Sequence, residues 1–292
     1  MSDLWDGIHA RWESIRHAVD HGDDGHRPPA AVARAGTLGV ATNPIVICGP
    51  PGAGKTVLYG ALAQLIRSGD PDSRRSPRIE KHTAQFGSGR RRTRAVVTVI
   101  PGQDSLERDE AMDDTMRGDA SPHGLVYVAC WGHNRIWQRT DQREVAARLT
   151  TGTRHVDPDE VRAWHLDKEL LDFRTLVRDL IDQQVATRLR WLIVVVSKAD
   201  LYWNRIDEAR DYYLPRPGGR QSPFGELLRD LEVDTSLNLA VLPMGSRLIR
   251  HQFLPGLPAQ TSQLDDSQLG VLRGHFSRTL RDFIDTGGDE RR

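Results

Sequence analysis

The chain has 292 residues, of which 38% are hydrophobic and 27% are charged, a balance typical of a globular protein with a sizeable core. Its 40 Lys and Arg side chains are matched by 40 Asp and Glu, so no net field favours nucleic acid or a membrane surface as partner. No apolar run reaches the roughly 18 residues of a membrane-spanning helix, acidic residues near the start argue against a signal peptide, and the two cysteines suggest no disulfide framework. We therefore expect a cytoplasmic protein without a transmembrane segment.

The chain begins with an amphipathic helix between residues 4 and 19. Its apolar positions recur at spacings of three and four, at Leu4, Trp5, Ile8, Trp12, Ile15 and Val19. We expect this helix to pack on the domain that follows, the alternative being a Trp-rich handle for a partner or a membrane surface. A Gly-, Asp- and Pro-rich linker follows, so we assign residues 1–39 to the helix and linker.

A phosphate-loop motif follows the apolar run from Ile45 to Cys48. The motif is Gly49-Pro50-Pro51-Gly52-Ala53-Gly54-Lys55-Thr56, and the helix predicted after it begins at Val57. In this arrangement backbone N–H groups and the helix N-terminus bind phosphate oxygens. Lys55 is expected to reach the β- and γ-phosphates, and the Thr56 hydroxyl to ligate the accompanying Mg²⁺. The motif predicts a nucleoside triphosphate site.

Two strands and an Arg- and Trp-rich segment come next. Residues 78–86 and 90–100 are predicted to form a hairpin, and its second strand ends at Pro101-Gly102-Gln103. A further strand is predicted at 125–130. We expect the segment from 131 to 153 to be free to act as a lid or an effector surface, and a helix starting near Asp157 to lay its apolar face on the sheet.

A base-reading motif follows the next β-branched apolar run. The run from Leu192 to Val196 leads into Ser197-Lys198-Ala199-Asp200. A carboxylate at Asp200 accepts from the ring N–H and the exocyclic amine of guanine together, whereas adenine offers no such pair of donors. Lys198 would lay its stem over the base. The remaining chain predicts a loop at 202–223, a last strand at 239–242, a closing helix at 269–284, and a disordered tail at 287–292.

The order of these motifs resembles Ras-like P-loop GTPases. The resemblance implies that Gly102 senses the γ-phosphate and that Gln103 orients the attacking water. It also implies that Gly245 and Ser246 present a short loop to the guanine oxygen. A switch hydroxyl that closes over Mg²⁺ is then expected at Ser76 or Thr83.

The family's switch II aspartate is missing, because its position is occupied by Val99. In this respect the wording is similar to bacterial GTPases related to the cell-polarity regulators, where this position is also non-acidic. The resemblance implies GTP or GDP as ligand, Mg²⁺ as cofactor, and a protein effector or regulator as partner. It rests on three short motifs between residues 45 and 200.

The sequence leaves three other functions open. The phosphate-loop sequence is also typical of AAA+ ATPases. These enzymes need an apolar strand ending in Asp-Glu, but no predicted strand ends that way. Kinase-type chemistry is a remoter alternative. Val99 favours a further one, a nucleotide-bound scaffold that hardly hydrolyses GTP.

The expected fold is α/β, a P-loop NTPase three-layer sandwich with a mostly parallel sheet and one antiparallel hairpin strand. It would span residues 40–286, with insertions at about 131–165 and 202–223 relative to a minimal Ras-like domain.

Overall fold

The computed structural model describes residues 3–22, 42–64, 80–86, 93–100, 115–116, 122–135, 142–145, 147, 157–182, 189–216, 218, 221–245, 251–253 and 257–286. Five residues named above, Ser76, Pro101, Gly102, Gln103 and Ser246, lie outside this part of the chain, as do residues 23–41 and the tail at 287–292.

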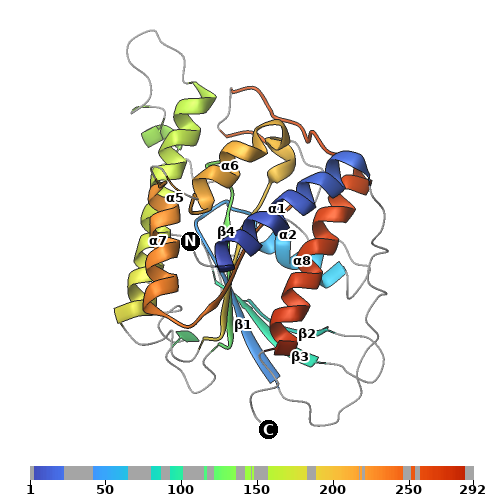
Figure 1. Cartoon of the computed structure of the whole chain (residues 1–292). Helices are drawn as coiled ribbons and strands as arrows, with labels where there is room; N and C mark the ends of the chain where they lie inside the picture. Colours follow the sequence, from blue (N-terminus) through green and yellow to red (C-terminus); the bar gives the residue numbers. More distant parts are fainter. Residues whose placement is uncertain are drawn as a thin grey trace.

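A six-stranded sheet forms the centre of the molecule (Figure 1), and its strands lie in the order β2-β3-β1-β4-β5-β6. The strands are β1 (Thr42–Cys48), β2 (Glu80–Phe86), β3 (Thr93–Val99), β4 (Gly124–Ala129), β5 (Trp191–Val196) and β6 (Asn238–Pro243). The five strands β3, β1, β4, β5 and β6, in sheet order, are parallel. At the edge of the sheet, β2 pairs antiparallel to β3. The expected α/β fold with a mostly parallel sheet is therefore confirmed.

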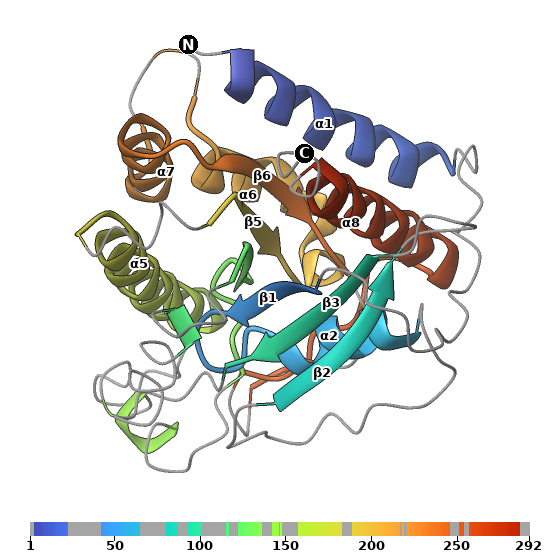
Figure 2. The same cartoon turned by 90° about the horizontal axis from the view of Figure 1, so that it is seen from below.

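Helices cover both faces of this sheet, with α1 and α8 along one face and α5 and α7 along the other (Figure 2). The α-helices are α1 (Asp3–His21), α2 (Lys55–Gln64), α5 (Pro158–Asp182), α6 (Ile206–Tyr213), α7 (Pro223–Asp234) and α8 (Asp266–Thr286). The ring of Tyr127 in β4 packs on Phe173 of α5, and Trp191 in β5 stacks on Phe283 of α8. Burial from both sides explains the unbroken apolar runs of β4 and β5.

The N-terminal helix α1 belongs to the same packed body. Trp5 and Trp12 are 1% and 0% exposed, and the helix lies against α8 and β6. The expectation that this helix packs on the following domain is confirmed, and neither tryptophan is available as a handle for a partner or a membrane. None of the helices in the described ranges is both long and apolar enough to cross a bilayer.

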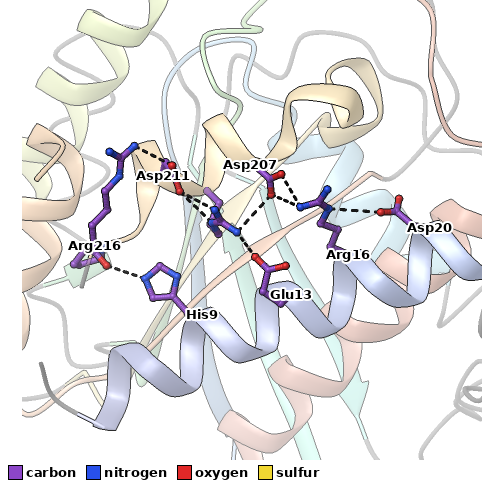
Figure 3. Close-up of polar contacts among 9 residues, drawn as sticks. His9, Glu13, Arg16, Asp20, Asp207, Asp211 and Arg216 are labelled. Carbon is purple, nitrogen blue, oxygen red and sulfur yellow. Dashed lines mark hydrogen bonds and ion pairs between the residues drawn. The ribbon is translucent and has the colours of Figure 1, made fainter. Parts of the chain in front are cut away.

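The polar side of α1 is paired with α6 (Figure 3). Arg16 donates to both oxygens of Asp207 at 2.6 Å, and Arg210 donates to Glu13. Because these side chains are partly exposed to water, the ion pairs fix the orientation of α1 more than they stabilise it.

The prediction of a loop at 202–223 is wrong over much of its length, because residues 203–213 are helical. The 3₁₀ helices η2 (Ala199–Leu201) and η3 (Trp203–Arg205) lead directly into α6. Ile206, Ala209 and Tyr213 are buried at helical spacing, while acidic and basic residues cover the outer side. This polar outer side made the segment look like a loop in the sequence, although its ion pairs with α1 belong to a helix.

Candidate functional site

The phosphate loop connects β1 to α2 and depends on its glycines. Gly49, Gly52 and Gly54 have φ values of 136°, 70° and 104°, in the region that favours glycine. A Cβ on Gly49 would lie 2.3 Å from the carbonyl oxygen of Val128, and one on Gly52 would lie 2.4 Å from that of Arg135. The loop therefore packs closely against β4 and the chain that leaves it.

The side chain of Lys55 lies back across this loop. It is 8% exposed, and its ammonium donates to the carbonyl oxygens of Gly49 at 2.7 Å and Pro50 at 2.9 Å. Thr56 and Val57 follow on the first turn of α2, both half-buried. Ala53 is buried and Pro51 exposed. The N-terminus of α2 thus points at the loop, an arrangement that suits an anion.

The strand β3 runs beside β1 and ends at the same edge of the sheet. The Ile100 N–H donates to the Ile47 carbonyl at 3.0 Å, so the end of β3 lies beside the end of β1, just before the phosphate loop. Val99 pairs with Ile47 and is 3% exposed. A buried valine offers no ligand to a metal-bound water. The backbone of Thr83 lies in β2 opposite Val96, and its side chain is outside what the structure describes.

Two residues of the base-reading motif bind the phosphate loop directly. The Ser197 hydroxyl donates to the carbonyl oxygen of Ala53 at 2.5 Å. Lys198 has a φ of 56°, and its ammonium donates to the carbonyl oxygens of Gly52 at 2.7 Å and His133 at 2.6 Å. Burial lowers the pKa of Lys198. The two motifs, about 145 residues apart in the sequence, therefore form a single site.

Asp200 places a carboxylate beside this site. It is 2% exposed, and its Oδ2 atom has no hydrogen-bond partner among the described residues. Gly245 lies against it, since a Cβ there would be 3.2 Å from Oδ1. Burial raises the pKa of Asp200 to about 6. A buried carboxylate oxygen without a donor is costly, and a ligand carrying N–H groups would satisfy it.

The chain leaving β4 contributes residues that the sequence did not reveal. The Asn134 amide donates to the Pro51 carbonyl at 2.8 Å and accepts from the Cys130 thiol at 3.2 Å. Trp131 to Asn134 are all buried, so the expectation of a free lid beginning at 131 is wrong for these residues. The available signal was a Trp-Gly turn at the carboxyl end of a strand, the edge where ligands bind in parallel sheets.

Neither a search for metal-binding groups nor comparison with known proteins identifies a ligand of this site. In the part of the chain that the structure describes, no three His, Cys, Asp or Glu side chains are placed to hold a metal ion. The Mg²⁺ expected from the sequence needs Thr56 and phosphate oxygens, so it stays a prediction. Comparison of the chain with protein-family models finds no match, and neither does comparison with curated proteins.

Proposed function

We propose that this protein binds GTP with Mg²⁺, hydrolyses it to GDP and phosphate, and acts as a nucleotide-dependent switch for a protein partner. The observation that carries the proposal is the direct bonding of Ser197 and Lys198 to the phosphate loop. Two residues after Lys198, the Oδ2 atom of Asp200 has no hydrogen-bond partner in the described part of the chain. These contacts support a single site in which the phosphate loop would bind the phosphates and Asp200 would bind the base.

The choice of guanine follows from the chemistry of Asp200. An ionised carboxylate only accepts hydrogen bonds. Guanine presents a ring N–H and an amino group side by side, whereas adenine presents a ring nitrogen acceptor at the corresponding edge. The stem of Lys198 would flank the base. This geometry supports GTP over ATP, because an acceptor facing Asp200 would be repelled.

The strand ends support the same choice among P-loop proteins. The chains leaving β3, β4 and β5 continue as Pro101-Gly102, Cys130-Trp131 and Ser197-Lys198. An ATP-driven remodeller needs a carboxylate pair at one of these ends. The helices on both faces and the loop between β1 and α2 are compatible with the three-layer P-loop sandwich and with the Ras-like resemblance.

Hydrolysis is assigned to Lys55, Gly102 and Gln103 as the resemblance implies. Lys55 would leave the carbonyls of Gly49 and Pro50 for phosphate oxygens, and Gln103 would align water. The scaffold alternative has one observation in its favour, the buried Val99 where a carboxylate would steady Mg²⁺.

Turnover of GTP separates a switch from a scaffold. We expect wild type to release phosphate from GTP at a rate well above that of Lys55→Ala. This change removes the ammonium group that would contact the β- and γ-phosphates. Gln103→Leu should slow release about 10-fold or more while sparing GTP affinity. A wild-type rate equal to that of Lys55→Ala would favour the scaffold, and unchanged turnover in Gln103→Leu would remove Gln103 from the mechanism.

A further inference from the structure

Glu169 is a buried carboxylate that the proposed mechanism does not use. It lies on α5 in the row of residues that faces the sheet, between His165 and Phe173, and is 0% exposed. Its Oε2 atom accepts from the backbone N–H of Cys130 at 2.8 Å, and its Oε1 atom accepts from the hydroxyl of Tyr213 on α6. Burial raises its pKa to about 7, against the bonds from Tyr213 and Cys130 that lower it.

Tyr213 extends this contact by one residue along the chain. Its hydroxyl oxygen accepts from the backbone N–H of Trp131 at 2.7 Å while the hydroxyl donates to Glu169. Two side chains from two different helices therefore hold two consecutive backbone amides, at the point where the chain leaves β4. Tyr213 is itself 0% exposed, so no water replaces either bond.

The held turn has a backbone that would not persist unaided. Trp131 has a φ of 48° and Gly132 a φ of 73°, and a Cβ on Gly132 would lie 2.4 Å from the carbonyl oxygen of Arg162. A left-handed conformation is disfavoured for a bulky residue and persists where the surroundings hold it. The guanidinium groups of Arg162 and Arg205 lie 4.4 Å and 5.0 Å from the Trp131 ring centre.

The other side of this turn touches the phosphate loop. Asn134 donates to the Pro51 carbonyl, the Arg135 N–H approaches the Gly52 carbonyl at 3.5 Å, and the carbonyl of His133 shares the Lys198 ammonium with Gly52. We name residues 130–134 the brace. A shift of the brace would change the shape of the phosphate loop but would leave the backbone of Asp200 in place, because the Gln263 N–H donates to the Asp200 backbone carbonyl at 2.7 Å.

We propose that Glu169 and Tyr213 are positioning residues that hold the brace against the phosphate loop, so that they set the affinity of the site for the phosphate chain and leave base choice to Asp200. This inference rests on the proposed function, since it takes the loop to bind the phosphates of a guanine nucleotide.

The test compares Tyr213→Phe with Tyr212→Phe, a change of the neighbouring residue. Among the residues that the structure describes, the Tyr212 hydroxyl reaches the Leu166 carbonyl alone, at 3.5 Å, so its loss is a matched control. We expect Tyr213→Phe to weaken GDP binding about 5- to 20-fold, because the Trp131 N–H is left buried without an acceptor. The ratio of GDP to ADP affinity should stay at its wild-type value, and Tyr212→Phe should bind GDP within about twofold of wild type.

A second pair of variants tests Glu169 with a conservative rescue. Glu169→Gln keeps an acceptor for the Cys130 N–H, and its amide can donate to the Tyr213 oxygen, so we expect GDP affinity within about threefold of wild type. Glu169→Leu removes both acceptors, so its GDP affinity should be as low as that of Tyr213→Phe or lower. If Glu169→Leu does not fold, Tyr213→Phe decides the matter.

Hydrogen–deuterium exchange without nucleotide supplies a readout independent of binding. Tyr213→Phe should speed exchange at residues 49–54 and 130–134, and Tyr212→Phe should not. The inference is overturned if Tyr213→Phe binds GDP as wild type does, or if it loses GDP affinity together with discrimination against ADP. Unchanged hydrogen–deuterium exchange in Tyr213→Phe also overturns it. If wild type binds no nucleotide but exchange responds as expected, the proposed function fails and the positioning of the loop by Glu169 and Tyr213 stands.

Discussion

At the residue scale, Asp200 carries the most chemical information, because its surroundings disfavour its charge. Burial raises its pKa to about 6, opposed by hydrogen bonding and by Lys198. The folded protein therefore holds this proton at a higher pH than the unfolded chain does. The contribution of Asp200 to the free energy of unfolding is greatest below about pH 4 and decreases as the pH rises toward 6.

The same group predicts a pH dependence of nucleotide affinity with the opposite sign. Only the ionised carboxylate accepts both guanine N–H groups, so GDP affinity should fall roughly 10-fold between pH 7 and pH 5. Titrations of GDP across this range check it. Asp200→Asn cannot ionise and should show no such fall, and a wild-type affinity that is flat from pH 7 to pH 5 would contradict the role of Asp200.

The residues predicted from the sequence and those missed differ in where their partners lie. Gly49 to Thr56 and Ser197 to Asp200 are each continuous motifs, and the pattern of residue types alone indicates their chemistry. Asn134, Glu169 and Tyr213 each bond to a segment far away in the sequence, and no local pattern of residue types records such a contact. A polar residue in the apolar row of α5 was the only visible sign of Glu169.

At the element scale, α1 and α6 show when periodicity predicts a helix. The apolar stripe of α1 is long and regular, and the structure confirms it over Asp3–His21. The eight residues of α6 contain only three buried positions, too few to stand out against their charged neighbours. The helix forms because its polar side pairs with α1 and its buried side packs in the core.

The contrast between the buried side and the polar side of α1 predicts which of its residues stabilise the fold. Trp12→Ala should lower the free energy of unfolding by about 3–5 kcal/mol, because it empties a fully buried site. Arg16→Ala should lower it by less than about 1 kcal/mol, because the pair with Asp207 is about 40% exposed on each side. Urea denaturation followed by circular dichroism measures both. Equal losses in the two variants would mean that ion pairs, not packing, hold α1.

At the scale of the whole molecule, the sheet order brings the site together. With β1 between β3 and β4, the phosphate loop begins between the end of β3 and the brace. The next strand, β5, delivers Ser197 and Lys198 to the same edge. The alternation of strands and helices predicted a parallel sheet, but which strands are neighbours depends on pairings between distant residues, such as Ile45 with Gly124 and Gly124 with Trp191.

The central claim, that Asp200 reads guanine at the phosphate loop, is tested most directly by a change of base preference. The dissociation constants of GDP and xanthosine diphosphate would be measured for wild type and Asp200→Asn. Xanthine carries a carbonyl where guanine carries its amino group, and an asparagine amide can donate to it. We predict that wild type prefers GDP by about 100-fold or more and that Asp200→Asn prefers xanthosine diphosphate, a reversal that a folding defect cannot produce. Unchanged GDP affinity in Asp200→Asn, or a wild-type preference for ADP, would contradict the account.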